Sequence, residues 1–234
     1  MPRRVALITG PTSGIGEGFA RRYAADGYDL VLVSRDADRL KRLAAELHNE
    51  GGRAVEVLPA DLAESADRGK VAERLAAGVD VLVNNAGVAI TGVREEDFDR
   101  GIAVNLKSAF LCTEALLPAM SARRWGRIVN ISSGAARGPG LLGVVYNAST
   151  AGLEGLTRGY ASRTAKDGIT VNAIARGPTD TEMGAPLKAG GVEARIPVGR
   201  MGQGEDVAQA TVMVIGNGFI TGQTIAVNGG LAFL

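Results

Sequence analysis

The stretch that decides the fold is Val5-Ala6-Leu7-Ile8-Thr9-Gly10-Pro11-Thr12-Ser13-Gly14-Ile15-Gly16. It is an apolar strand pattern that breaks into a glycine-spaced turn and then continues as an amphipathic helix. Glycines let a backbone approach an anion closely, and the N-terminus of the next helix offers unpaired N–H groups and a partial positive charge. The spacing Gly-x-x-x-Gly-x-Gly differs from the common Gly-x-Gly-x-x-Gly fingerprint, and glycines in such turns can be purely structural. We predict a pyrophosphate-binding turn and look to the rest of the chain for support.

Composition and charge narrow the class of protein. The chain has 234 residues, 46% of them hydrophobic, and a formal net charge of +1, which suits a single domain over residues 1–234 with a substantial core. The near-zero charge argues against nucleic acid or an anionic membrane as a partner. We see no apolar run approaching the roughly 18 residues of a membrane span and no room for a signal peptide. We therefore expect a cytoplasmic protein.

Cysteine and histidine are nearly absent. A lone cysteine, Cys112, excludes an internal disulfide, and its apolar surroundings favour a buried thiol. The single histidine, His48, makes histidine-based triads and His-rich metal sites improbable, so we expect no metal centre.

Hydrophobic patterning predicts the architecture. Leu40, Leu43 and Leu47 share one face of a helix predicted over 37–50, and similar helical periodicity separates most of the apolar runs. Continuous Val/Leu/Ile strands between such helices indicate an α/β fold, with a parallel sheet of about seven strands covered by helices on both faces. The strands are expected at about 4–9, 29–33, 54–58, 79–83, 127–131, 170–175 and 224–227.

Motifs in a fixed order run nearly from end to end of the chain. They are Thr9-Gly10-x-x-x-Gly14-Ile15-Gly16, Asp61-Leu62, Asn84-Asn85-Ala86-Gly87, Asn105, Ile131-Ser132-Ser133, Tyr146, the stretch 171–183 and Ile220-Thr221-Gly222-Gln223. The set resembles the short-chain dehydrogenase/reductase family, in particular its beta-ketoacyl carrier-protein reductase-like branch. This resemblance implies a doubly wound Rossmann fold and hydride transfer between a nicotinamide dinucleotide and a carbonyl or secondary alcohol.

The resemblance also implies which residues bind the cofactor. Asp61 and Leu62 would contact adenine, Asn85 to Gly87 would border the adenosine ribose, and Thr181 would hold the nicotinamide carboxamide. The full set of candidates is Gly10, Thr12, Ser13, Gly14, Ile15, Gly16, Ser34, Arg35, Asp61, Leu62, Asn85, Ala86, Gly87, Thr179 and Thr181.

The end of the second strand predicts the preferred cofactor. NAD-selective members carry an acid there for the ribose 2′-OH, whereas this chain has Ser34 followed by Arg35. A guanidinium would pair with a 2′-phosphate, so we expect NADP(H). Asp36 is expected to begin the next helix instead. A merely solvated Arg35 is the alternative.

Catalysis in the family rests on an Asn, a Ser, a Tyr and a Lys. Asn105, Ser133 and Tyr146 match the first three, which suits a phenol that protonates a ketone oxygen held by a hydroxyl. Thr150 stands where the lysine belongs, four residues after the tyrosine. It could keep a hydrogen bond to the nicotinamide ribose but not the charge, so we expect impaired turnover that Thr150→Lys would raise.

The missing lysine leaves other interpretations open. The chain could be a catalytically degenerate NADP(H)-binding protein, a redox sensor or an inactive oligomer partner, and the substitutions at Thr150 and Arg176 could be engineered. Arg176 replaces the family's proline after the sixth strand. Its side chain could be solvated, could partly replace the missing charge, or could bind pyrophosphate or an anionic substrate.

Two further expectations concern surfaces. The segment 182–204 is predicted to be an irregular substrate lid, with an apolar lining from Leu187, Val192, Ile196 and Val198 and three cations, Lys188, Arg195 and Arg200, that are either solvated or anion contacts. Helices over about 97–120 and 146–166 carry small residues that permit close packing between subunits, and members of the family that the chain resembles pair subunits through these helices. These small residues are Ala109, Ala115, Ala151, Gly152 and Gly155. We therefore predict a homo-oligomer, most simply a homotetramer.

Overall fold

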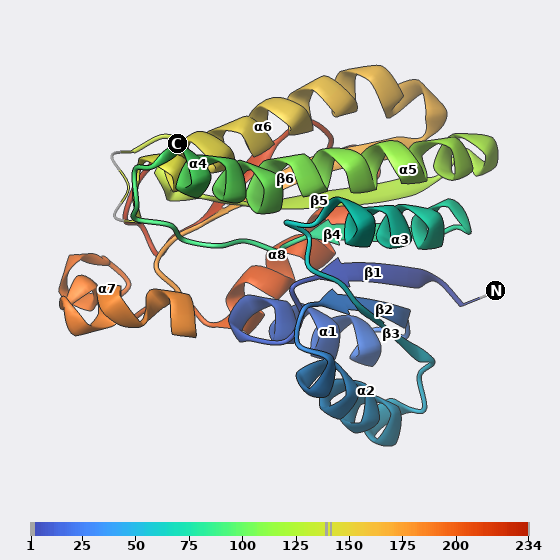
Figure 1. The fold of residues 1–234 in the computed structure, drawn as a ribbon, viewed down its shortest axis with the longest axis horizontal. Coiled ribbons are helices and arrows are strands. Elements are labelled where there is room, and N and C mark those ends of the chain that lie inside the picture. Colours follow the sequence, from blue (N-terminus) through green and yellow to red (C-terminus); the bar gives the residue numbers. More distant parts are fainter. Residues whose placement is uncertain (1–2, 139, 141, 234) are drawn as a thin grey trace.

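The protein was analysed as a computed structural model, which describes residues 3–138, 140 and 142–233. Its centre is a seven-stranded, all-parallel sheet in the order β3-β2-β1-β4-β5-β6-β7 (Figure 1). The strands are β1 (Val5–Thr9), β2 (Asp29–Ser34), β3 (Val55–Pro59), β4 (Val81–Asn84), β5 (Gly126–Ser133), β6 (Ile169–Arg176) and β7 (Thr224–Val227). All seven expected strands are present, and the doubly wound topology is confirmed.

Helices cover both faces of the sheet (Figure 1). The α-helices are α1 (Gly14–Ala25), α2 (Ala37–Gly51), α3 (Ser65–Ala76), α4 (Glu95–Ile102), α5 (Ser108–Arg123), α6 (Val144–Thr164), α7 (Ala185–Ala189) and α8 (Gly204–Gly216). Short 3-10 turns are η2 (Gly134–Ala136), η3 (Ala165–Asp167), η4 (Glu182–Gly184) and η5 (Val192–Arg195), and η1 (Ala103–Lys107) is a π-helical turn between α4 and α5.

Two apolar cores lie on opposite faces of the sheet. Phe19 and Tyr23 of α1 and the three leucines of α2 belong to one core, together with residues of α8. Val71 of α3 and Leu116 of α5 belong to the other, together with residues of α6. The leucines of the helix predicted over 37–50 therefore face the core as expected. The Asp36 side chain caps α2 by accepting the Arg39 N–H at 2.9 Å.

One long helical run departs from the sequence expectation. The run Glu95–Arg123 is long enough, and apolar enough at a mean hydropathy of 1.2, to meet a length and composition criterion for a membrane span. The expectation that no apolar run approaches that length was wrong on this criterion. In the fold the run packs against α3, β5 and α6, which gives its apolar side chains partners within the protein.

The strand ends set the position of the site. The chain order reverses between β1 and β4, and in such sheets ligands bind beyond the carboxyl ends of the strands at the reversal. Both β5 and β6 run further than expected, so that Ser133 and Arg176 are register partners at this edge. The strand extension brings Arg176 into the sheet, where the sequence prediction had left it in a turn.

Candidate active site

The glycine turn folds as a close-approach backbone cradle. Gly10 and Gly14 have φ values of +67° and +54°, in the left-handed region that favours glycine. A Cβ on Gly16 would lie 2.0 Å from the Gly10 carbonyl oxygen. The N-cap of α1 is Ser13, whose side chain makes no capping bond among the described residues. The first N–H groups of α1 thus point into the cleft with the positive end of the helix dipole.

Side chains of β1 and of the loop after β4 hold this turn in place. The Thr9 hydroxyl oxygen accepts the N–H groups of Asn85 and Ala86 at 3.0 and 2.9 Å. The Asn85 amide donates to the carbonyls of Thr9 and Gly10 at 3.0 and 2.9 Å. Two hydrogen bonds at the Thr9 hydroxyl and two from the Asn85 amide hold the turn, so its backbone is preorganised before any ligand binds.

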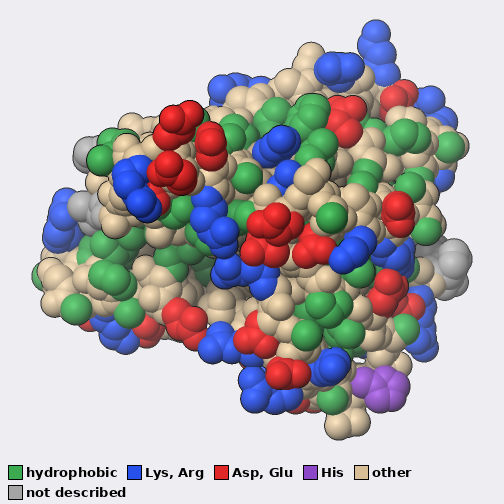
Figure 2. Space-filling model, viewed as in Figure 1, with side chains coloured by type: hydrophobic (Ala, Val, Ile, Leu, Met, Phe, Trp, Pro, Cys, Tyr) green, Lys and Arg blue, Asp and Glu red, His purple; other side chains and the backbone are tan. Residues whose placement is uncertain are grey.

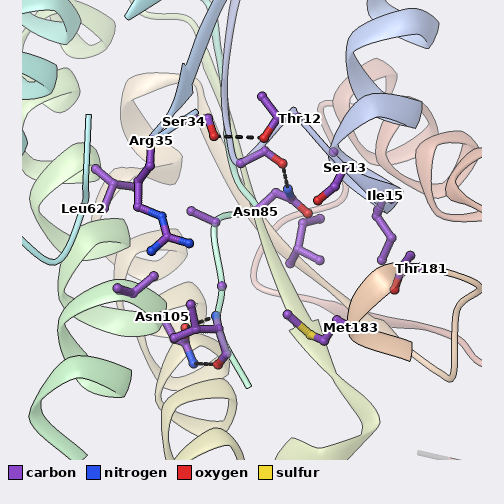
Figure 3. Close-up of a pocket in the computed structure, with 18 of the residues that line it drawn as sticks. Thr12, Ser13, Ile15, Ser34, Arg35, Leu62, Asn85, Asn105, Thr181 and Met183 are labelled. Atoms are coloured by element: carbon purple, nitrogen blue, oxygen red, sulfur yellow. Dashed lines mark hydrogen bonds between the residues drawn. The ribbon is translucent and has the colours of Figure 1, made fainter. Parts of the chain in front are cut away.

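A basic group stands at the end of β2. Figure 3 shows the Arg35 side chain extending into the cleft from beside Ser34, whose hydroxyl is hydrogen-bonded to that of Thr12 at 2.9 Å. Arg35 is 59% exposed, and its nearest acid is Asp61, with Nη1 and Oδ2 3.9 Å apart. A loose surface ion pair of this kind contributes little, so the guanidinium can be redirected to a phosphate at small cost.

Asn105 sits in the π-helical turn η1, a local widening that often occurs at functional sites. Its amide donates to the Val88 carbonyl at 3.0 Å, and its carbonyl oxygen accepts the Val88 N–H at 2.8 Å (Figure 3). The same amide donates to the Ser149 hydroxyl on α6 at 3.0 Å. Asn105 therefore joins the loop after β4 to the helix that carries Tyr146.

Tyr146 lies in the first turn of α6 and is 6% exposed. Its hydroxyl accepts a hydrogen bond from Nη2 of Arg176 at 3.1 Å. Arg176 is itself only 7% exposed, and the same nitrogen lies 3.1 Å from the Met183 sulfur. The interpretation of Arg176 as a solvated substitution was wrong, because the residue ends a buried strand instead of entering the following turn.

Thr150 is buried one turn further along α6 and lines the same cleft. Its hydroxyl is within hydrogen-bond distance of the carbonyls of Tyr146 and Asn147, at 2.9 and 3.2 Å. This back-bonding satisfies the hydroxyl inside its own helix. Thr150 thus carries no charge, and its hydroxyl proton is committed to carbonyls of its own helix in this structure.

Ser133 and its neighbours lie beside the cleft. The Ser133 hydroxyl accepts the Ala135 N–H at 3.2 Å, which leaves its own proton available to donate. Ser132 lies within hydrogen-bond distance of the Glu154 carboxylate at 3.3 Å, and Arg137 donates to the other oxygen of Glu154 at 2.8 Å. This buried carboxylate ties the end of β5 to α6, so that Ser133 and Tyr146 are held on a common frame.

The lid is more ordered than the sequence predicted. It contains η4, α7 and η5, and Val192, Ile196 and Met201 form a small core of their own against which Leu187 packs. Val198 is 64% exposed and is no part of that core. Lys188 and Arg200 are paired with Asp180 and Asp206, each at 2.7 Å, so both are surface ion pairs.

The structure brings most of the predicted site residues together. Of the catalytic candidates, Asn105, Tyr146 and Thr150 line the cleft, whereas Ser133 lies beside it. Thr179 is 1% exposed, bonds to the Gly177 carbonyl and does not line the cleft. Fourteen of the cofactor candidates do line it: Gly10, Thr12, Ser13, Gly14, Ile15, Gly16, Ser34, Arg35, Asp61, Leu62, Asn85, Ala86, Gly87 and Thr181.

Nine lining residues were absent from the predicted set: Val33, Ala60, Val88, Val104, Ile131, Leu153, Arg176, Glu182 and Met183. Glu182 and Met183 stand at the start of the lid. The sequence left the role of Arg176 open between a solvated side chain, a replacement for the missing charge and an anion contact, and did not include it among the site residues. The departure from the family's Pro-Gly turn was the only signal for Arg176. Nothing in the sequence pattern distinguished Met183 from an ordinary lid residue.

The cleft fits a nicotinamide dinucleotide. A Cβ on Gly14 would lie 2.6 Å from the Thr181 methyl carbon, so the glycine turn and the start of the lid approach each other closely. Phosphates would bind the N–H groups of the glycine turn, the adenosine end would lie near Arg35 and Asp61, and the nicotinamide end would lie near Thr181 and Tyr146.

Comparison with known proteins agrees with this geometry. The family model for short chain dehydrogenases matches residues 4–190. The chain belongs to the short-chain dehydrogenase/reductase family. It is 38% identical to nodulation protein G of Rhizobium meliloti (strain 1021), over 99% of this chain and 98% of that protein. It is 34% identical to the 3-oxoacyl-acyl-carrier-protein reductase FabG of Aquifex aeolicus, over 97% of each chain.

A solved structure extends the likeness to three dimensions. A variant of the actinorhodin polyketide ketoreductase, determined with NADPH, superposes with a TM-score of 0.90 at 32% identity, over 98% of this chain and 97% of that one. The predicted family and its reductase-like branch are thereby confirmed, and this short-chain dehydrogenase/reductase is an oxidoreductase.

Proposed function

We propose that this short-chain dehydrogenase/reductase transfers a hydride between NADP(H) and a carbonyl or secondary alcohol, with Tyr146 as the proton donor. The observation that carries the proposal is the position of the Tyr146 phenol, which lies in the same cleft as the glycine turn and the Arg35 guanidinium. A dinucleotide lying along that cleft brings its nicotinamide to the phenol.

The residues divide the chemistry between them. NADPH, when bound, supplies the hydride. Tyr146 donates its hydroxyl proton to the carbonyl oxygen, and Ser133 donates a hydrogen bond to the same oxygen. Asn105 acts as a positioning residue, because its bonds to Val88 and Ser149 fix α6 against the loop after β4.

The preference for NADP(H) over NAD(H) rests on Arg35. Ser34 and Arg35 place a hydroxyl and a guanidinium at the end of β2, and no acid stands at either position to accept bonds from a ribose 2′-OH. The bound NADPH of the actinorhodin ketoreductase variant supports this choice. Asp61, the partner of Arg35, would exchange that ion pair for its contact with adenine.

The substrate side of the cleft is an apolar groove under the lid. Its lining includes the apolar side chains of Leu142, Met183, Leu187 and Val192 and two charged residues, Glu182 and Arg195. Of the three lid cations, Arg195 alone lacks a carboxylate partner among the described residues. An apolar ketone with an anionic group at its far end matches this lining.

The assembly and the compartment are also part of the proposal. We infer a cytoplasmic homotetramer that packs through α5 and α6. Ala151 and Gly155 are exposed on α6, whereas Ala109 is buried and Gly152 is partly buried, where an added Cβ would meet Leu106. The small-residue surface is therefore narrower than the sequence predicted.

The competing function is NADP(H) binding without catalytic turnover. The absence of the family's lysine, whose position Thr150 occupies, favours it. An NADPH oxidation assay against a panel of ketones and beta-ketoacyl esters separates the two. We expect slow oxidation that depends on the ketone, and a loss of about a hundredfold or more in Tyr146→Phe with NADPH affinity unchanged. NADPH binding without oxidation by any ketone, in both the native protein and Tyr146→Phe, would establish the competing function.

A further inference from the structure

The end of β6 places a buried cation on the reacting phenol. Arg176 is the last residue of β6, and its Nη2 lies 3.1 Å from the Tyr146 hydroxyl oxygen. The only other contacts of its guanidinium are the Met183 sulfur at 3.1 Å and the Gly177 carbonyl at 3.4 Å, among the residues that the structure describes. A buried guanidinium without a carboxylate partner is costly, so its position calls for an explanation.

We propose that Arg176 supplies the positive charge that stabilises the Tyr146 phenolate, in place of the cation missing at Thr150. The charge has thus moved from helix α6 to the end of strand β6. For its effect on turnover this inference rests on the proposed function. Its effect on the ionisation of Tyr146 does not, because Arg176 contacts the phenol directly.

Geometry and chemistry both favour this role. When Tyr146 gives its proton to a carbonyl oxygen, the phenolate oxygen gains a full negative charge within hydrogen-bond distance of Nη2. Arginine stays charged at every working pH, so the stabilisation persists through the alkaline range in which a lysine would begin to lose its proton. Thr150 offers no competing charge, since its hydroxyl is bonded to carbonyls of its own helix.

The other charged side chains around this part of α6 either interact with groups other than Tyr146 or are solvent-exposed. Glu154 is paired with Arg137, Arg100 lies 3.7 Å from Asp61, and Asp97 is paired with Arg94. The Glu114 carboxylate accepts the Tyr160 hydroxyl, 2.6 Å away. The remaining ones are solvent-exposed: Glu95, Glu96, Asp99, Lys107, Arg123, Arg158, Arg163 and Glu182.

Ionisation of Tyr146 can be followed without cofactor or substrate, by the ultraviolet difference spectrum of phenolate. The chain has four tyrosines, and burial raises the pKa of Tyr23 and of Tyr160 above the ordinary value. Subtracting the titration of Tyr146→Phe removes the contribution of the other three tyrosines. The same subtraction is made in each Arg176 background.

We expect the ionisation midpoint of Tyr146 to rise by about 1–3 pH units in Arg176→Gln and to return toward the native value in Arg176→Lys. Arg176→Pro, the residue of related proteins at this position, repeats the measurement if the glutamine variant fails to fold. Arg158→Gln is the matched control, because it removes an exposed cation of the same helix that has no bond to Tyr146, and it should leave the midpoint within about half a unit.

Activity of the same variants separates this inference from the proposed function. The alkaline limb of alcohol oxidation should move with the Tyr146 midpoint in Arg176→Gln and be restored in Arg176→Lys. If the midpoint shifts but no carbonyl is ever reduced, the inference stands and the proposed function falls. An unchanged midpoint in both Arg176→Gln and Arg176→Pro would overturn the inference, as would a KM increase confined to anionic substrates without any change in midpoint.

Discussion

The side-chain amide of Asn105 donates to the hydroxyl of Ser149 over 3.0 Å, three residues beyond Tyr146 on the same helix. Asn105→Asp keeps the size of the side chain but removes the amide donor, so the Val88 carbonyl loses its bond from Asn105 and the Ser149 hydroxyl keeps only its bond to the Tyr146 carbonyl. We expect kcat to fall about ten- to a hundredfold and unfolding to become about 1–3 kcal/mol easier. Steady-state kinetics and urea denaturation measure the two effects.

The matched control for Asn105 is Asn217→Asp, which changes an exposed asparagine outside the cleft. It should leave kcat unchanged. Equal kcat values for Asn105→Asp and the native protein would remove Asn105 from the positioning network.

Arg35 is predicted to select the cofactor. Arg35→Ala should weaken NADPH binding about ten- to a hundredfold and leave NADH binding nearly unchanged, because only the 2′-phosphate loses a charge-assisted partner. Fluorescence titration with both nucleotides measures this. Arg94→Ala, an exposed arginine that pairs with Asp97 outside the cleft, should affect neither. Equal losses for NADPH and NADH would assign Arg35 a role other than selection.

Gly16 tests the close approach of the glycine turn. A Cβ at this position would meet the Gly10 carbonyl oxygen at 2.0 Å, so Gly16→Ala should displace the turn, weaken NADPH binding more than tenfold and cost about 1–3 kcal/mol in stability. A Cβ at Gly69 in α3 would meet nothing within 4 Å, so Gly69→Ala should instead raise the free energy of unfolding by about 0.5–1 kcal/mol. Similar NADPH affinity and stability in the two variants would show that the turn accommodates a Cβ at Gly16.

The oligomer is predicted to depend on the exposed face of α6. A Cβ at Gly155 meets nothing within 4 Å in the protomer, so Gly155→Arg should leave the fold intact and block packing by another subunit. Light scattering should give a tetrameric mass for the native protein and a smaller mass for this variant. Gly69→Arg is the surface control. A tetramer that persists in Gly155→Arg would place the interface elsewhere.

Much of the architecture was predictable from local pattern. The continuous apolar runs and the leucines of α2 specify buried parallel strands and sheet-facing helices, and Asp36 caps α2 as expected. The glycine turn was equally predictable, because Gly10 and Gly14 need a positive φ and Gly16 has no room for a Cβ. Red and blue side chains are intermingled on the visible surface, in keeping with the near-neutral charge (Figure 2).

The catalytic end of the cleft was less predictable, because it depends on where strands stop. A strand prediction ending at residue 175 places Arg176 in the following turn and leaves its role open, whereas one further residue of pairing with Ser133 buries it against Tyr146. Thr150 was recognised as a departure, but the carbonyls that occupy its hydroxyl are set by helix geometry. The lid core of Val192, Ile196 and Met201 depends on contacts between short turns that carry no periodic signal.

The position of Arg176 reverses one expectation drawn from the sequence. Adding a lysine at position 150 to the native chain would set a second cation close to a phenol that already has one. The benefit expected of Thr150→Lys should therefore appear only when Arg176 is removed as well.

The most direct test is a double-mutant cycle on kcat/KM for ketone reduction, with Thr150→Lys, Arg176→Pro and their combination. The account predicts that Arg176→Pro lowers kcat/KM by about a hundredfold, that Thr150→Lys alone changes it by less than about threefold, and that the combination recovers at least the native value. The account would be contradicted by Arg176→Pro with native activity, or by Thr150→Lys that raises kcat/KM equally in both backgrounds.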